Sequence, residues 1–226
     1  MSNKKAIALI IENIQYLEQA KKLVEGEVYE ELCTVIDNKV KDYLENLEHE
    51  WNGTFSFYED GTIQFAPESW RAKNEQEFKH QQFYARYFLG CESQETGGDC
   101  TEWWLTTFLK NDVDYMVFNF YPWRDNYLKC TAKDWKMFTT EKNQIHPEIE
   151  QLGFKYNAKE GSWYLVIDGI DPTVFIENYE SETLEDALSP FETALDILKQ
   201  AHSYFDAIVK AAIEKFNIES NAGDEH

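Results

Sequence analysis

The sequence lacks the motifs that would assign it an enzymatic mechanism. None of the G-x-S-x-G, P-loop and G-x-G-x-x-G patterns occurs in its 226 residues, which argues against a nucleophile elbow and against the usual phosphate-binding loops. No pair of histidines, and no cysteine with a histidine, has the spacing of zinc ligands. No apolar run reaches the ~18 residues of a membrane span. These absences favour a non-enzymatic protein with no cofactor, metal site or membrane segment.

Basic residues are also scarce. The chain has 21 Lys and Arg against 42 Asp and Glu, a net charge of -21. Nucleic-acid binders collect basic residues to displace counterions, so we expect no direct binding to DNA or RNA. Acidity keeps a protein soluble, but carboxylates on successive helical turns, about 5.4 Å apart, can also imitate a phosphate backbone. The charge predicts an inhibitor or regulator that binds a basic, nucleic-acid-binding protein by charge mimicry.

The cysteines are few and widely spaced. Cys33, Cys91, Cys100 and Cys130 form no CxxC pair. The first residues lack the apolar core of a signal peptide, so we expect free thiols in a reducing cytoplasm. A disulfide between Cys91 and Cys100, across the hairpin loop that they flank, is the alternative.

The aromatic residues are concentrated in segments that alternate like strands. Residues 83–89, 102–109 and 115–120 have period-two alternation, which predicts a three-stranded antiparallel meander. Asp60-Gly61, between two short alternating runs, predicts a further hairpin. Later strands are expected at 154–156, 163–167 and 174–176.

Helical spacing dominates both ends of the chain. Ile7, Ile10, Ile14 and Leu17 form one seam, and a second helix over 28–47 is expected to complete an αα-hairpin within residues 1–50. Another helical stretch is predicted at 131–152. The last helix, 189–216, carries a long seam, with Ser189 as N-cap, Pro190 at the first helical position and Glu192 completing a capping box.

Together these segments predict an α+β fold in one domain, 1–226. An aromatic-rich antiparallel meander in the sheet region, 51–178, would lie between the N-terminal αα-hairpin and the long C-terminal helix. The hairpin would pack on that helix, or its seams would pair two copies as a homodimer.

Two acid-rich segments are the candidate partner-binding surface. We choose Glu30 and Glu31 from the first, and Glu185 and Asp186 from the second. The adjacent Trp103 and Trp104 must point to opposite faces of the predicted strand. If helices leave one face uncovered, Trp104 and Phe108 would form an exposed aromatic patch of the kind that marks interaction sites.

Two alternatives remain. The first is a small-molecule-binding domain with an aromatic cavity between the sheet and the C-terminal helix, where Arg71, Lys73 and Arg86 would contact an anionic ligand. The second is a metal-dependent enzyme, in which a turn brings together Asp168, Asp171 and Glu177. His202, on the apolar seam, is expected to be a neutral imidazole with one hydrogen-bonded partner, and a pH switch or a base only if a carboxylate also faces it.

Overall fold

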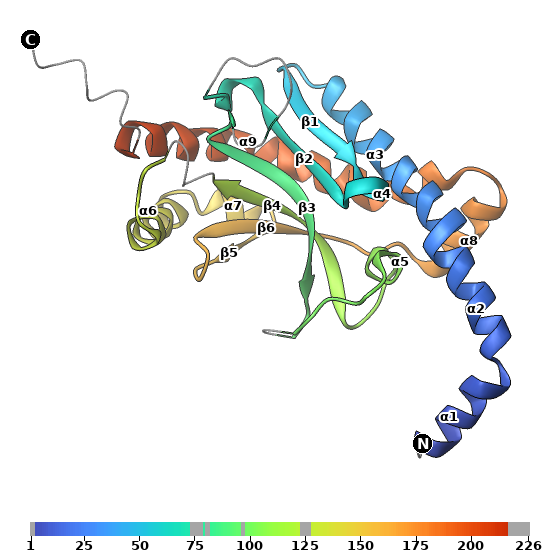
Figure 1. Cartoon of the computed structure of the whole chain (residues 1–226). Coiled ribbons are helices and arrows are strands. Elements are labelled where there is room, and N and C mark those ends of the chain that lie inside the picture. The colour runs from blue at the N-terminus through green and yellow to red at the C-terminus, as the bar shows by residue number, and fades with distance from the viewer. Residues whose placement is uncertain (1–2, 73–78, 80–81, 96–97, 123–127, 217–226) are drawn as a thin grey trace, which may run out of the picture.

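The computed structural model describes residues 3–72, 79, 82–95, 98–122 and 128–216 (Figure 1). Its helices are α1 Asn3–Glu12, α2 Ile14–Leu23, η1 Val24–Val28, α3 Tyr29–Glu45, α4 Phe57–Asp60, η2 Glu68–Trp70, α5 Trp104–Phe108, α6 Ala132–Ile145, α7 Glu148–Gln151, α8 Pro172–Glu180, η4 Leu184–Leu188 and α9 Ser189–Phe216. Its strands are β1 Trp51–Ser56, β2 Thr62–Pro67, β3 Ala85–Ser93, β4 Asp114–Pro122, β5 Phe154–Asn157 and β6 Ser162–Ile167.

The strands form one antiparallel sheet in the order β1-β2-β3-β4-β6-β5. The predicted fold class, α+β with an aromatic-rich antiparallel sheet, N-terminal helices and a long C-terminal helix, is confirmed. The hairpin at Asp60-Gly61 is also confirmed. There β1 pairs with β2, and Gly61 takes the left-handed conformation, φ 61°, after the short helix α4.

The core lies between this sheet and α9, which crosses one face of it (Figure 1). Along α9, nine side chains are buried. Phe205 is at their centre: its ring stacks on Phe120 with centroids 4.5 Å apart and meets Phe154 edge-on at 5.0 Å. Large rings dominate core energetics, and many of the aromatic residues of the sequence pack in this layer between the sheet and α9.

The N-terminal helices continue along the edge of this core and then leave it. α3 buries Leu32, Ile36 and Val40. Gly26 interrupts the helix: its backbone is not helical, φ -109° and ψ -105°, and the chain bends there inside η1. Beyond the bend, α1 and α2 extend away from the body (Figure 1), and none of their residues is buried. We call α1 and α2, residues 3–23, the N-terminal arm.

The strand predicted at 102–109 was wrong, because residues 104–108 form helix α5. Trp104 and Phe108 are spaced by four residues, and both rings pack on Phe57, at 4.9 and 5.7 Å. The same residues fit a period of two and a period of 3.6. The buried Asp114 carboxylate helps to hold this segment in place, since it accepts hydrogen bonds from the Thr101 backbone N–H, at 2.6 Å, and from the Thr107 hydroxyl, at 3.1 Å.

The strand predicted at 174–176 was also wrong, because these residues lie in α8. Asp171 caps this helix by accepting a bond from the Thr173 N–H at 2.9 Å, and Pro172 takes the first helical position. Ser189 was wrongly predicted as an N-cap. Its backbone is helical, φ -54° and ψ -32°, because η4 leads directly into α9.

The prediction of free thiols was wrong for Cys91 and Cys100, which form the disulfide given as the alternative, whereas Cys33 and Cys130 form no disulfide. Disulfides persist mainly in oxidising surroundings. The predicted cytoplasmic location therefore loses one of its two arguments and stays a prediction. Among the described residues, no helix is long and apolar enough to span a membrane.

Candidate functional site

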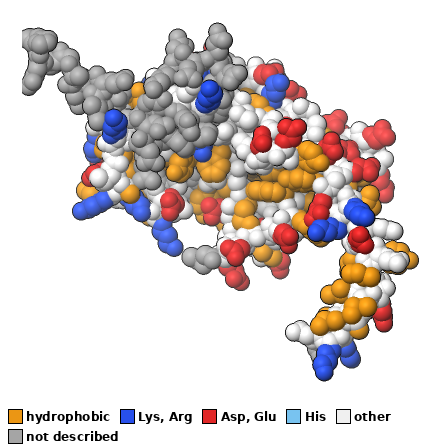
Figure 2. Space-filling model, in the orientation of Figure 1, with side chains coloured by type: hydrophobic (Ala, Val, Ile, Leu, Met, Phe, Trp, Pro, Cys, Tyr) orange, Lys and Arg blue, Asp and Glu red, His pale blue; other side chains and the backbone are white. Residues whose placement is uncertain are grey.

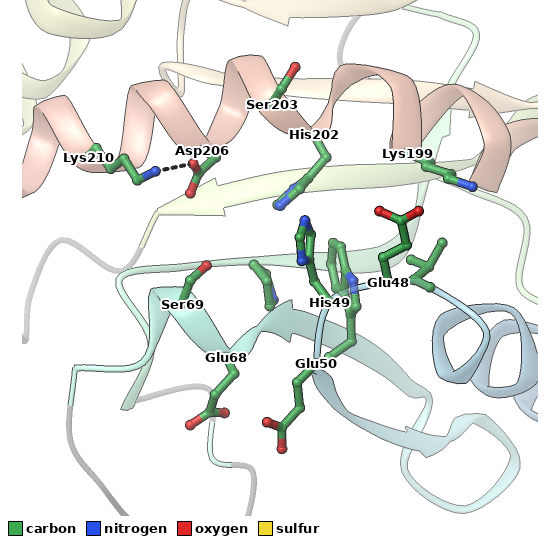
Figure 3. A pocket seen from close by; sticks show the side chains of 13 residues that line it. Glu48, His49, Glu50, Glu68, Ser69, Lys199, His202, Ser203, Asp206 and Lys210 are labelled. Atoms are coloured by element: carbon green, nitrogen blue, oxygen red, sulfur yellow. Dashed lines mark ion pairs between the residues drawn. The ribbon is translucent and has the colours of Figure 1, made fainter.

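A cleft of about 710 Å³ opens where α9 passes the end of the β1–β2 hairpin (Figure 3). One wall is the loop 47–50 with Trp51, and the next is Pro67 with Glu68 and Ser69. The antiparallel register explains why these segments meet: Trp51 pairs with Pro67 at the last position of the ladder. The cleft is therefore built on the rigid end of a hairpin.

The third wall is one polar side of α9. It contributes Lys199, His202, Ser203, Asp206 and Lys210, which recur at three- and four-residue spacing. Residues so spaced share one helix face. This face lies next to the buried seam, so α9 both closes the core and lines the cleft.

His202 lies at the base of this wall, surrounded by aromatic rings. Its imidazole centroid is 4.8 Å from that of Trp51, 5.2 Å from that of Trp70 and 6.2 Å from that of Tyr87. Burial lowers the pKa of His202 to about 4, although Asp206 opposes this change and His49 supports it. The imidazole is therefore neutral at pH 7, as predicted, and a carboxylate does face it.

The tautomer of His202 follows from its partner. The Tyr87 hydroxyl, fully buried, lies 3.1 Å from His202 Nδ1, the only hydrogen-bond partner of that hydroxyl among the described residues. This hydroxyl has no other acceptor within the described residues, so its own proton is satisfied only if it donates to Nδ1, and on this ground we assign the proton of the neutral ring to Nε2. Burial also raises the pKa of Tyr87 well above its usual value. Nε2–H is thus left as a donor for another group.

Asp206 stands one helical turn beyond His202. Its carboxylate accepts hydrogen bonds from Trp70 Nε1 at 3.1 Å and pairs with Lys210 at 2.6 Å. Burial opposes its ionisation, but these two donors and the neighbouring positive charge hold the pKa of Asp206 below its usual value. Its charge is therefore permanent above acidic pH, and Trp70 fixes its position.

The charge of the cleft is negative overall. Four carboxylates line it, from Glu48, Glu50, Glu68 and Asp206, against the ammonium groups of Lys199 and Lys210. Glu68 pairs with Arg71 and accepts a bond from Asn52 at 2.8 Å, so part of its charge is already satisfied. A cleft with this balance disfavours phosphorylated ligands.

The function has to be inferred from the geometry of this cleft, because comparisons with known proteins found no similar protein. No protein-family model matches the chain, and no match was found among curated proteins or solved structures.

Arg71 and Arg86, two of the basic residues predicted to hold a ligand, do not line the cleft. Arg71 lies beside it, paired with Glu68 and placed over the Phe83 ring at 4.8 Å. Arg86 precedes Tyr87 on β3 and so points to the opposite face of the sheet, over the rings of Phe88 and Tyr121, both at 5.6 Å. Lys73 lies outside the described residues.

The predicted partner-binding residues are divided by the fold. Glu30 and Glu31 open α3, Glu185 and Asp186 lie on η4, and these two helices contact each other. The acids are thus brought to one end of the body, where Figure 2 shows acidic side chains gathered. Phe108 is buried in the core and does not reach this surface, whereas Trp104 is half-buried, packs on Phe57 and lines a small cavity with Glu25 and Tyr29.

The three carboxylates proposed for a metal do not form a site. Asp171 is the cap of α8, while Asp168 and Glu177 are exposed. In the described part of the chain, no group of three His, Cys, Asp or Glu side chains is arranged to hold a metal ion.

Of the residues at this cleft, His202 was singled out from the sequence. Trp51, Trp70, Asp206 and His49 were not. The periodic polar row on α9 next to the apolar seam was the available signal. Trp51 and Trp70 had no such signal, because only the pairing of β1 with β2 brings them to α9.

Proposed function

We propose that the protein is a small-molecule-binding domain whose site is the cleft between α9 and the β1–β2 hairpin. The observation that carries this proposal is the neutral His202, whose Nε2–H is left unused by Tyr87 at the base of a 710 Å³ cleft. A pocket of this size suits a metabolite, since ligand sites commonly span ~300–1,000 Å³.

The lining favours a flat ligand that is neutral or positively charged. The Trp51 indole, half-buried at the edge of the cleft, offers a surface for stacking. His202 would donate to a ring acceptor, and the excess carboxylates would attract an amine. Phosphorylated compounds would be repelled by the same carboxylates.

Two matched pairs of probes test this chemistry: adenosine against AMP, and tryptamine against indoleacetate. Binding is followed by calorimetry on the full chain. Adenosine and tryptamine are expected to bind more tightly than their anionic counterparts, and Trp51→Ala to weaken binding at least tenfold. Trp103→Ala is the control, because Trp103 is an exposed indole outside the cleft. Equal binding by wild type and Trp51→Ala, or no binding by any of the four probes, would contradict the proposal.

A second candidate is binding of a basic protein partner by the acidic end of the body. It is supported by the contact between α3, which carries Glu30 and Glu31, and η4, which carries Glu185 and Asp186. The partner would be a nucleic-acid-binding protein whose basic groove the carboxylates occupy. Capture of such a protein at low salt, lost at high salt and lost in a Glu30→Gln, Glu31→Gln, Glu185→Gln, Asp186→Asn variant, supports this candidate. Capture that is insensitive to salt contradicts it.

A further inference from the structure

The N-terminal arm carries eight of the fifteen large apolar side chains that are exposed in the described part of the chain. No residue of α1 or α2 is buried. Eight of its large apolar side chains are between 47% and 73% exposed: Ile7, Leu9, Ile10, Ile11, Ile14, Tyr16, Leu17 and Leu23. Figure 2 shows hydrophobic side chains, in orange, exposed along the arm. Apolar patches of this kind mark interaction sites.

Five of these side chains share one face. Ile7, Ile10, Ile14 and Leu17 follow the three-four spacing of a helix-pairing seam, and Ile11 lies beside it. On the opposite side Leu9, Tyr16 and Leu23 are exposed beside Glu12 and Gln19. The arm therefore exposes apolar side chains on two sides, and the row of Ile7, Ile10, Ile14 and Leu17 has the spacing that suits pairing with another helix.

The arm is not expected to keep this form alone. α1 and α2 have ten residues each, and isolated helices shorter than ~12–15 residues are marginal in water. Contact with the body ends near Glu25, which accepts a bond from Trp103 Nε1 at 3.2 Å. The helical arm therefore needs a partner that covers its seam.

We infer that this partner is the arm of a second copy, paired helix to helix. Two-fold pairing is self-complementary, so one seam serves both copies. Five side chains that each cover roughly 100 Å² bury ~500 Å² per copy and ~1,000 Å² in total, about the minimum for a specific interface.

An anionic membrane surface fits the arm less well. Residues 3–23 carry Lys4, Lys5, Lys21 and Lys22 against Glu12 and Glu18, a net charge of 4 - 2 = +2, and the rest of the chain carries -23. Membrane-surface helices concentrate Lys and Arg along one polar face, whereas the lysines of the arm lie in pairs at its two ends. A body of this charge is also repelled by anionic lipids.

The test is the mass of the full chain in solution. Sedimentation equilibrium and light scattering are expected to give twice 26.6 kDa for the wild type and 26.6 kDa for Ile10→Asp/Ile14→Asp. The matched control, Gln15→Asp/Gln19→Asp, adds the same charge to the arm at polar positions outside the row of Ile7, Ile10, Ile14 and Leu17. This variant is expected to remain a dimer. Both variants change exposed residues, so near-ultraviolet circular dichroism of the body should not change.

Three outcomes would overturn the inference. They are a single-chain mass for the wild type at every concentration, a dimer that persists in Ile10→Asp/Ile14→Asp, and loss of the dimer in the control variant alone. Flotation with phosphatidylcholine–phosphatidylserine vesicles is run in parallel. A monomeric wild type that floats, and an Ile10→Asp/Ile14→Asp variant that does not, would assign the seam to lipid instead.

Discussion

The N-terminal arm and α9 have the same kind of seam but opposite surroundings. Both repeat apolar residues at three- and four-residue spacing. α9 buries nine side chains, whereas α1 and α2 bury none. The pattern predicts that a face needs a partner, but it does not say whether the partner lies in the same chain. The seam of α9 packs on the sheet of the same chain, whereas the arm extends away from the body at the bend in η1.

The largest expected effect comes from truncating the centre of the α9 seam. Phe205→Ala should lower the free energy of unfolding by about 3–5 kcal/mol, because it opens a cavity between four rings of the sheet. Ile10→Ala in the arm should change the unfolding of the body by less than about 0.5 kcal/mol. Urea unfolding followed by tryptophan fluorescence measures both. Similar losses would mean that the arm packs on the body.

The second effect is a pH dependence set by His202. The unfolded pKa is ~6.5 and the folded pKa is about 4, so the unfolded state binds more protons between these values. Stability therefore falls as pH drops from ~6.5 to ~4, by about 2–3 kcal/mol from this residue. His202→Gln should flatten that part of the curve. Unfolding midpoints across this range measure it, and an unchanged slope in the variant would exclude His202 as the source.

The third effect separates a buried indole from an exposed one. Trp70→Phe removes a donor from Asp206 and should cost about 1–2 kcal/mol, while the pKa of Asp206 rises. Trp103→Phe also removes a bond, to Glu25, but at the exposed base of the arm, and should cost less than about 0.5 kcal/mol. Thermal unfolding of both variants makes the comparison. A larger loss of stability in Trp103→Phe than in Trp70→Phe would contradict this expectation.

The smallest effect concerns the cap of α8. Asp171→Ala should lower the melting temperature, because the Thr173 N–H loses its acceptor. Asp168→Ala, an exposed neighbour, should leave the melting temperature nearly unchanged. Equal destabilisation by the two variants would contradict the capping role of Asp171.

The sequence predicts the strands and the long helix that form the layers of this fold better than it predicts the short helices α5 and α8. Alternation located β3 and β4, and the seam located α9, because both patterns report one buried face. Trp104 and Phe108 were misread because their spacing fits a strand and a helix, and only their contact with Phe57 decides. Asp171-Pro172 was read as a turn, although the same two residues begin α8.

The cleft was mostly beyond prediction. His202 and Tyr87 are 115 residues apart in the chain, and Trp51 reaches them only through the pairing of β1 with β2. Tertiary packing, not a local motif, brings these groups together. The polar row on α9 was the one part visible beforehand.

The most direct test of the binding proposal is the imidazole nitrogen NMR spectrum of His202 in the full chain, recorded against pH with and without adenosine or tryptamine. We predict that the His202 ring is neutral and protonated on Nε2, that its pKa is near 4, and that its Nε2 resonance shifts when a probe binds. A ring that titrates near its usual pKa, or an Nε2 resonance that neither probe moves, would contradict it.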